Sequence, residues 1–292
     1  MIELKQKKLI RVTLKIKYKK EGIEMDRAEE QIREYEHQAD LQRLRGLRPI
    51  DDDFMRCLFK DNIELAEFVL RIIIGKEDLI ITECQTQKDM KRLVGARSVC
   101  LDAYGTDSSG KKYDLEIQRE DKGANPHRAR YHSSVLDVEN LNAGQDFHEL
   151  PDTYTIFITE KDFYGEGKAI YLIERINLTI NRPFKDGEHI LYVNGEYRGK
   201  SDLGKLMHDF NCTNAADMNY EIMAERTRYL KENPRGVSEM CKVLEEMRNE
   251  TAEKTLVQTI KNLMETMKWS AEQAMAAMKI PTSEQEKYKS RL

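Results

Sequence analysis

The sequence has few residues that crosslink a chain or interrupt it. Among 292 residues there are six prolines, one tryptophan and five cysteines. The cysteines are odd in number and scattered, and no two have the spacing of zinc ligands, which argues against a disulfide framework: Cys57, Cys84, Cys100, Cys212 and Cys241. Such cysteine usage is typical of reducing compartments, so we expect a cytoplasmic protein.

Long apolar runs are also missing. No stretch approaches the roughly 18 apolar residues that span a bilayer, and the N-terminus has no apolar segment followed by a small-residue cleavage site. We therefore expect neither a membrane partner nor an export signal. Hydrophobic residues make up 40% of the chain, which suffices for one core, and the mean hydropathy of −0.69 indicates long solvated helical faces elsewhere.

Acidic and basic residues nearly balance, with a net charge of −4, but their distribution is uneven. Residues 1–20 contain eight Lys or Arg against the single acid Glu3. This segment is either a basic arm that contacts phosphates, or a solvated, poorly ordered extension, or translated sequence upstream of a true start at Met25.

The first part of the chain is expected to be helical. Residues 25–47 are rich in Glu and Arg and predict an exposed helix. Asp51, Asp52 and Asp53 place acids where a helix N-terminus favours them, and predict a helix running to about Lys60. Residues 63–74 are apolar nearly all round and stop at Gly75, which predicts a buried helix.

A β-rich centre follows, with one helix expected at residues 125–142. Alternation, β-branched content and turn residues predict strands over these ranges: 78–85, 98–104, 112–118, 153–159, 169–175 and 189–193. The turn 106–110 between the second and third of them predicts a hairpin. Residues 182–187 are expected to form a loop.

From about Ser201 onward the chain is expected to be helical. Leu256, Ile260, Leu263 and Met267 form an apolar stripe, and such a helix packs on a partner of its own chain or of another subunit. Ser270 with Gln273, and Ser283 with Glu286, have the spacing of capping boxes at the last two helices.

The hairpin carries the residues with the most evident chemistry. Asp114, Glu116 and Gln118 occupy alternate positions of one strand, so their side chains share a face. If the hairpin turns near Ser108, Asp102 lies opposite residues 114–116, within reach of a cation shared with Glu116. Two carboxylates with a backbone carbonyl and waters suit Mg²⁺ or Mn²⁺. Such an ion supplies the activated water and the charge neutralisation that phosphodiester hydrolysis needs.

The alternative is a hairpin with a polar, water-facing side, because acids often occupy exposed strand positions. The apolar Leu101, Leu115 and Ile117 on the other face fit both interpretations. Other sites are weaker: His127 and His132 are five apart instead of four, and a surface or internally satisfied histidine is expected for each. No nucleophile elbow, Walker loop or dinucleotide fingerprint is present.

Several ordered motifs resemble a known family. The segment 99–119, with its aspartate strand, its turn and Tyr-Asp-Leu-Glu-Ile-Gln, resembles the core of the PD-(D/E)XK nuclease superfamily, and specifically the bacterial recombination-promoting nucleases or putative transposases. Asp52 to Phe59 is similar to the opening helix of that family, Arg128 to Tyr131 to its Arg-x-x-Tyr helix, and residues 150–158 to the strand that follows. The resemblance covers roughly residues 48–209.

The resemblance implies roles by position. Asp102 and Glu116 become metal ligands, Gln118 takes the place of the superfamily's lysine, and Asp52 is the acid that supports the metal shell, ahead of Glu64. Gln118 lacks the positive charge of a lysine, which shifts water activation onto the metal, although the family tolerates glutamine there. Met55-Arg56 replaces the family's Phe-Lys. The expected contacts with DNA are Arg56, Arg128, Arg130 and Tyr131. Lys88 and Lys91, with Arg92, are expected to form a basic loop before the Asp102 strand, which either contacts the DNA backbone or is solvated surface.

Three of these contacts have alternatives. Arg128 and Arg130 do not share a helix face, so one can bind a phosphate while the other pairs with an acid such as Glu120. Tyr131 either stacks on a base or packs in the core.

We therefore expect an α/β restriction-endonuclease-like fold, with a mixed central sheet, flanking helices and a helical C-terminal extension. The expected organisation is an extension over residues 1–47, a nuclease-like domain over 48–212 and a helical extension over 213–292. The expected function is Mg²⁺- or Mn²⁺-dependent DNA cleavage in recombination, mobile-element movement or defence, by a homo-oligomer, a dimer through its helical regions. The alternatives are a catalytically silent relative that binds DNA or a protein, and an oligomerisation module with a solvated acidic face.

Overall fold

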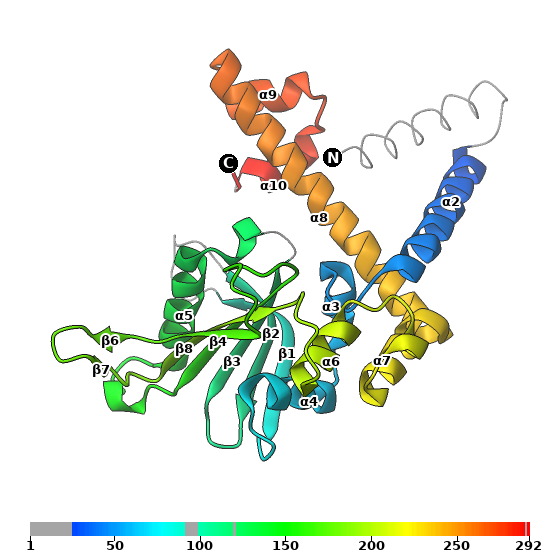
Figure 1. The fold of residues 1–292 in the computed structure, drawn as a ribbon. Coiled ribbons are helices and arrows are strands. Elements are labelled where there is room, and N and C mark those ends of the chain that lie inside the picture. The colour runs from blue at the N-terminus through cyan, green and yellow to red at the C-terminus, as the bar shows by residue number, and fades with distance from the viewer. Residues whose placement is uncertain (1–24, 91–98, 119–120, 290) are drawn as a thin grey trace. The chain divides into compact units, whose positions relative to one another are not determined.

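The computed structural model of the chain describes residues 25–90, 99–118, 121–289 and 291–292. One compact unit ends at Cys241, and a second comprises Lys242–Leu292. Figure 1 shows the elements of both units. The domain limits expected from the sequence, after residues 47 and 212, stay predictions.

Three helices precede the sheet and agree closely with the sequence prediction. They are α2 (Met25–Gly46), α3 (Asp52–Leu58) and α4 (Ile63–Ile74). The Asn62 side chain accepts from the Leu65 N–H at the start of α4, and Gly75 ends α4 in the left-handed conformation, with its N–H donated to the Arg71 carbonyl. Both ends of α4 are therefore satisfied by local residues.

The first unit is built on a mixed sheet, as expected from the sequence, with six strands in the order β1-β2-β3-β4-β8-β5. β2 is antiparallel to both β1 and β3, β4 is parallel to both β3 and β8, and β5 is antiparallel to β8. The strands are β1 (Ile81–Met90), β2 (Val99–Asp107), β3 (Lys112–Gln118), β4 (Thr153–Thr159), β5 (Ile170–Ile173) and β8 (Glu188–Asn194). A separate two-stranded ribbon joins β6 (Ile176–Asn177) to β7 (Arg182–Pro183). The expected loop at residues 182–187 is therefore wrong in its first two residues, which pair with β6.

The hairpin of β2 and β3 sets the register on which the site depends. Ala103 pairs with Leu115 and Tyr104 with Asp114, so the same register places Asp102 beside Glu116. At the turn, the Asp107 carboxylate accepts from the backbone N–H groups of Ser109 and Lys111. This local acceptor holds the turn and confirms the predicted hairpin.

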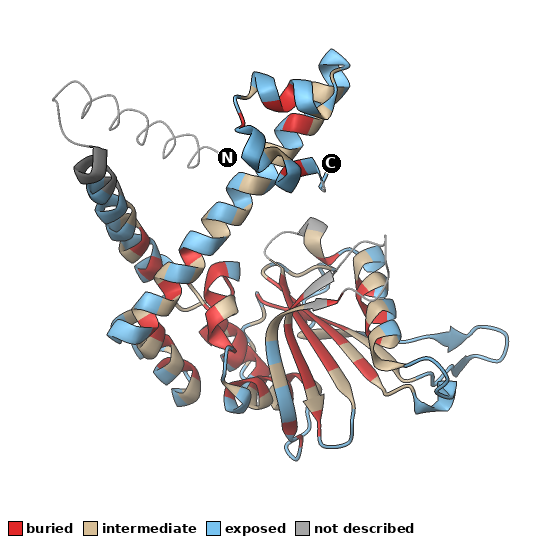
Figure 2. Ribbon diagram, turned by 180° about the vertical axis from the view of Figure 1, so that it is seen from behind, coloured by how far each residue is buried: buried red, intermediate tan, exposed pale blue. Residues whose placement is uncertain are grey.

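Helices from both halves of the unit pack on the sheet, and buried residues concentrate in its central strands (Figure 2). α5 (Pro126–Asn140) packs on β4 and β8, α4 packs on β1, and α3 contacts β3. α6 (Asp202–Phe210) packs on α4, and α7 (Glu221–Glu232) packs on α3. Short 3-10 turns lie at Asp121–Ala124 (η1), Phe147–Glu149 (η2) and Ala215–Asp217 (η3).

The C-terminal segment is helical, as expected from the sequence. α8 (Pro234–Met267) begins in the first unit and continues into the second, which also contains α9 (Ala271–Ala277) and α10 (Thr282–Lys289). In the second unit, Ile260 of the predicted stripe is fully buried with Ala274 and Met275 of α9, and Leu256 and Leu263 pack beside them. The stripe therefore packs on a helix of its own chain, although Met267 at its end is half-exposed.

Only one of the two predicted capping boxes is present at this end of the chain. Ser270 and Gln273 cap α9 reciprocally. The box predicted at Ser283 is wrong, because α10 begins one residue earlier, at Thr282, so that Ser283 lies inside the helix. In the part of the chain that the structure describes, no helix is both long enough and apolar enough to cross a membrane.

Gly75 provides a test of the fold. Its φ of +71° is disfavoured for residues with a Cβ, so Gly75→Ala is expected to lower the free energy of unfolding by about 1 kcal/mol. Gly46→Ala is the matched control, because Gly46 ends α2 without positive φ and a Cβ there meets open space. Urea denaturation of both variants measures the difference. Equal stability of the two variants would contradict the left-handed cap.

Candidate active site

Asp102 and Glu116 hold each other's strands through their carboxylates. The backbone N–H of Asp102 donates to Glu116 Oε1 over 3.0 Å, and the backbone N–H of Ile117 donates to Asp102 Oδ2 over 3.0 Å. Each carboxylate thus uses one oxygen to bond the neighbouring strand, and its other oxygen is directed elsewhere. The predicted proximity of Asp102 and Glu116 is confirmed.

The three alternate residues of β3 face α5. Arg128 donates to Glu116 Oε2 over 2.8 Å and to Gln118 Oε1 over 3.2 Å. Arg128 Nε donates to His132 Nε2, and His132 Nδ1 lies 3.0 Å from Asp114 Oδ2. Because His132 Nε2 accepts, Nδ1 carries the hydrogen of the neutral ring and donates it to Asp114. One connected set of bonds therefore covers this face of β3.

Burial makes these carboxyls unusual acids. Asp114 and Glu116 are fully buried, so the alternative of a hairpin with a water-facing acidic side is wrong. Burial, followed by the charge of neighbouring carboxylates, raises the pKa of both groups well above its ordinary value. Burial likewise raises the pKa of Asp102 to about 6, against the lowering effect of its bond from Ile117. The ionised forms are therefore destabilised unless positive charge is supplied.

α3 directs one of its three N-terminal aspartates to the site. Arg48 pairs with Asp51 over 3.0 Å, and Arg43 pairs with Asp53. The charge of Asp52 raises the pKa of Asp102, and the charge of Arg56, one turn further along α3, lowers it. The structure therefore brings Asp52 and Arg56 within electrostatic reach of Asp102. Glu64 is exposed in the first turn of α4.

The other predicted DNA contacts are spread more widely. Lys88 is not in a loop, as expected, but in β1, with its ammonium 3.7 Å from the Tyr104 ring centroid. Tyr131 packs against a core cluster, which is the second of the two roles that the sequence allowed. Arg130 is exposed on α5, and Lys91 lies outside the described residues.

Sequence reasoning missed the roles of Asp114 and His132. Asp114 was placed on the correct face but given no partner. His132 was expected to be either a surface histidine or an internally satisfied one, and the structure shows the second. The available signal was the spacing of Arg128 and His132, four apart on one helix and therefore on one face. The expected acid partner Glu120 lies outside the described residues; the acid that pairs with Arg128 is Glu116.

The charges of the site leave room for a divalent cation. Four carboxyls and two guanidiniums act on one another here: Asp52, Asp102, Asp114, Glu116, Arg56 and Arg128. With these carboxyls and guanidiniums ionised and the His132 ring neutral, two negative charges remain, which one divalent cation neutralises. In addition, Asp114 Oδ1 is buried without a hydrogen-bond partner among the described residues. Carboxylate oxygens are the donors that Mg²⁺ and Mn²⁺ prefer, so the residues present fit such an ion.

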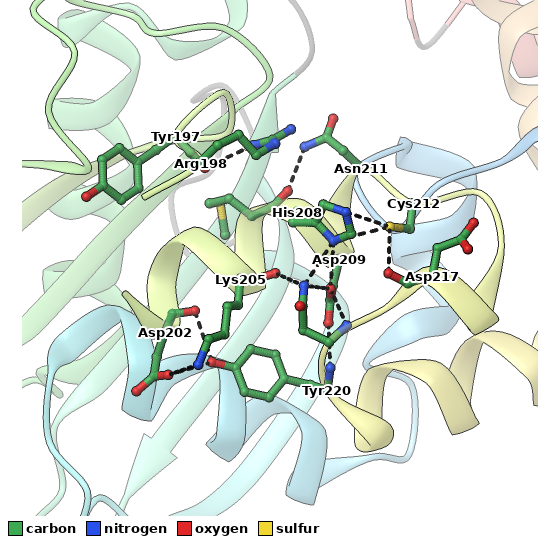
Figure 3. A network of polar contacts seen from close by, with 12 residues as sticks. Tyr197, Arg198, Asp202, Lys205, His208, Asp209, Asn211, Cys212, Asp217 and Tyr220 are labelled. Carbon is green, nitrogen blue, oxygen red and sulfur yellow. Dashed lines mark hydrogen bonds and ion pairs between the residues drawn. The ribbon is translucent and has the colours of Figure 1, made fainter. Parts of the chain in front are cut away.

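Donor atoms close enough to share one metal occur in two groups of the described residues. One is Asp114, Glu116 and His132, next to Asp102, and the other is His208, Asp209 and Cys212 at the end of α6. Figure 3 shows the second group within a wider polar network. Its buried carboxylate, Asp209, already accepts from the backbone N–H groups of Asn219 and Tyr220 over 2.8 and 2.9 Å. This second network therefore has a structural explanation, because it ties α6 to the start of α7.

A pH titration tests the environment of Asp102. Between pH 4 and pH 6 the folded protein keeps a proton on Asp102 that the unfolded chain has released, so ionisation of Asp102 lowers stability as pH rises through this window. Asp102→Asn cannot ionise and still accepts from Ile117. We expect the free energy of unfolding of the parent, relative to Asp102→Asn, to fall by about 2 kcal/mol from pH 4 to pH 7. Urea denaturation in EDTA measures it; parallel pH curves for the two proteins would refute the assignment.

A second substitution tests the structural role of Asp209. Asp209→Asn turns an NH₂ group toward a backbone N–H donor and leaves that donor unsatisfied, so we expect stability to fall by about 2–3 kcal/mol. Asp217→Asn is the control, because it makes the same change on an exposed side chain nearby. Chemical denaturation measures both variants. Should Asp209→Asn unfold at the same denaturant concentration as Asp217→Asn, Asp209 does not hold this junction.

Comparison with known proteins supports the same conclusion as the geometry. Residues 60–292 match the family described as PD-(D/E)XK nuclease family transposase, so the match begins after Asp52 and Arg56 and includes the helical C-terminal segment. No curated protein and no solved structure matches the chain. The mixed sheet with flanking helices, its aspartate and Glu-x-Gln on adjacent strands, and the match over most of its length show that the chain belongs to the PD-(D/E)XK nuclease family of transposases.

Proposed function

We propose that this protein is a Mg²⁺- or Mn²⁺-dependent DNA endonuclease. The observation that carries the proposal is the reciprocal anchoring of Asp102 and Glu116, inside a site with more negative than positive charge. Two carboxylates fixed on adjacent strands by backbone N–H groups are preorganised, because neither needs to reorganise when a ligand binds. Membership of a nuclease family makes phosphodiester hydrolysis the reaction that such a site serves.

Each residue has a role in the proposed site. Asp102 and Glu116 hold the cation, which supplies an activated water and neutralises charge that develops on the phosphate. Gln118 orients the water or the phosphate through its amide, and Asp52 supports the metal shell from α3. Burial around Glu116 excludes bulk solvent and strengthens each of these electrostatic interactions.

The absence of a lysine at position 118 does not leave the site without a cation. The guanidinium of Arg128 donates to Gln118 Oε1, so a positive charge from α5 lies beside the position where the superfamily has its lysine. Arginine is always charged and binds phosphate oxygens well. This contact supports an active enzyme over the catalytically silent relative.

DNA is the proposed substrate, with contacts through Arg56, Arg128 and Arg130. Of the other predicted contacts, the position of Tyr131 in the core favours packing over base stacking, and Lys88 and Lys91 stay predictions. We propose a cytoplasmic protein that acts in recombination, mobile-element movement or defence. A homodimer through the helical regions stays a prediction.

Plasmid cleavage tests the function. The parent protein is expected to nick supercoiled plasmid with Mg²⁺ or Mn²⁺ and to spare it in EDTA. Asp102→Ala and Glu116→Ala are each expected to lower the nicking rate by about 100-fold or more, because each removes charge stabilisation worth several kcal/mol. Glu77→Ala is the matched control, because Glu77 is an exposed acid outside the site. Gel separation of nicked and supercoiled DNA gives the rates.

The outcomes separate the proposal from its rivals. Nicking by Asp102→Ala and Glu116→Ala at the parental rate would show that these residues hold no catalytic metal. A protein that retards DNA on a gel but never cuts it, with either metal, is the silent relative. A protein that does neither, and whose dimer is lost when residues 236–292 are deleted, is the oligomerisation module.

A further inference from the structure

We propose that Arg128 is a displaceable counter-ion, which occupies the cation-binding side of Glu116 in the metal-free protein and moves to a DNA phosphate when a divalent metal binds. The proposal rests on the proposed function, since it assigns a role to Arg128 within the same metal site. Four observations on the described residues support it.

The first is that all three nitrogens of the guanidinium donate to residues of the site. Its Nη2, Nη1 and Nε donate to Glu116, Gln118 and His132 over 2.8, 3.2 and 3.2 Å. Each of its three nitrogens therefore contacts a residue on the site side of α5. Arg128 holds the position that a cation ligated by Glu116 would need, because its Nη2 donates to Oε2, the oxygen that is not bonded to Asp102.

The second is that Arg128 lies at the wrong end of its helix for a cation. Pro126 is the first residue of α5, and the Asn125 side chain caps the helix by accepting from the Arg128 N–H. The first turn of a helix favours anions, because its free N–H groups carry partial positive charge. The dipole of the helix gives a cation there no support, so the electrostatic attraction that holds this side chain comes from the carboxylates of the site, with Glu116 in direct contact.

The third is a difference in exposure between the partners. The Glu116 side chain is 0% exposed, whereas the Arg128 side chain is 36% exposed. Glu116 is fixed in the sheet, but the guanidinium can leave it for water or for a ligand outside. Glu116 therefore keeps its position, whereas the Arg128 side chain can move.

The fourth is the sign of the charges. A divalent cation and a guanidinium on one carboxylate repel each other, and the repulsion is weakly screened beside a buried group. Metal binding therefore weakens the contact between Arg128 and Glu116. A guanidinium released at this point is close to Gln118 and carries the charge and donor geometry that phosphate oxygens accept. Binding of the metal then favours binding of the substrate phosphate, because the metal releases Arg128 to contact that phosphate.

Calorimetric titration with Mn²⁺ tests the competition directly. Arg128→Gln removes the competing charge, so we expect it to bind Mn²⁺ at least fivefold more tightly than the parent. Arg130→Gln removes the same charge from an exposed position on the same helix, and we expect its Mn²⁺ affinity to be that of the parent. Equal or weaker Mn²⁺ binding by Arg128→Gln would overturn the proposal, because a residue that only positions Glu116 for the metal gives that result.

Two further measurements keep the outcome clear. If Arg128→Gln does not fold, Arg128→Lys replaces it: a lysine keeps the charge but cannot contact Glu116, Gln118 and His132 together, so Mn²⁺ binding should tighten by a smaller factor. Nicking by Arg128→Gln should be at least tenfold slower at saturating Mn²⁺ despite the tighter binding; nicking as fast as the parent overturns the phosphate role.

Failure of the proposed function gives a different result. In that case neither the parent nor Asp102→Ala shows specific Mn²⁺ heat, and the proposal about Arg128 fails with it. If the parent binds Mn²⁺, Asp102→Ala does not, and Arg128→Gln binds no more tightly than the parent, then only the proposal about Arg128 is wrong.

Discussion

Burial of the Asp114 and Glu116 carboxyls between β3 and α5 is the constraint around which this end of the sheet is built. A carboxylate removed from water is costly unless hydrogen-bond donors and opposite charges replace the water. The backbone of β2 supplies the donor for Glu116, and α5 supplies Arg128 and His132. The last backbone pair between β2 and β3 is Ala103 with Leu115, so the Asp102 N–H is available for a side chain. The site therefore lies at the end of the backbone pairing between β2 and β3.

The position of α3 depends on residues far along the chain. Arg226 of α7 donates to the Leu58 carbonyl at the end of α3 over 3.1 Å, where the unpaired carbonyls of the helix carry partial negative charge. Ahead of α3, the Ile50 N–H donates to the Phe210 carbonyl of α6 over 3.0 Å. The helices after the sheet therefore hold the helix that carries Asp52 and Arg56. This dependence agrees with a family match that includes the helical segment beyond residue 212.

Local sequence signals predicted where the helices and strands begin and end better than they predicted what packs on each of them. Periodicity and turn residues gave the bounds of α4, β3 and β4, and the strand alternation of Asp114, Glu116 and Gln118 gave their common face. Alternation shows which side chains share a face of a strand, but not what packs on that face. The sequence therefore allowed a water-facing position for these acids, whereas in the structure α5 packs over them. The pair of Arg128 with Glu116 joins a helix to a strand and has no local pattern. Lys88 was assigned to a loop because the strand was predicted to end at residue 85, whereas β1 continues to Met90. The strand passes through Gln87, whose φ is +54°.

The replacement of a lysine by Gln118 changes where the positive charge of the site comes from. A lysine on β3 would be held beside Glu116 by the strand itself and would share the site with the metal. Here the cation comes from the first turn of α5, on a side chain that is more than a third exposed and that bonds both Glu116 and Gln118. Gln118 can accept from this guanidinium because its amide has an acceptor oxygen, whereas a lysine there would have none and would repel Arg128. The glutamine and the arginine are therefore one arrangement, in which the strand supplies fixed acceptors and the helix supplies an exchangeable charge.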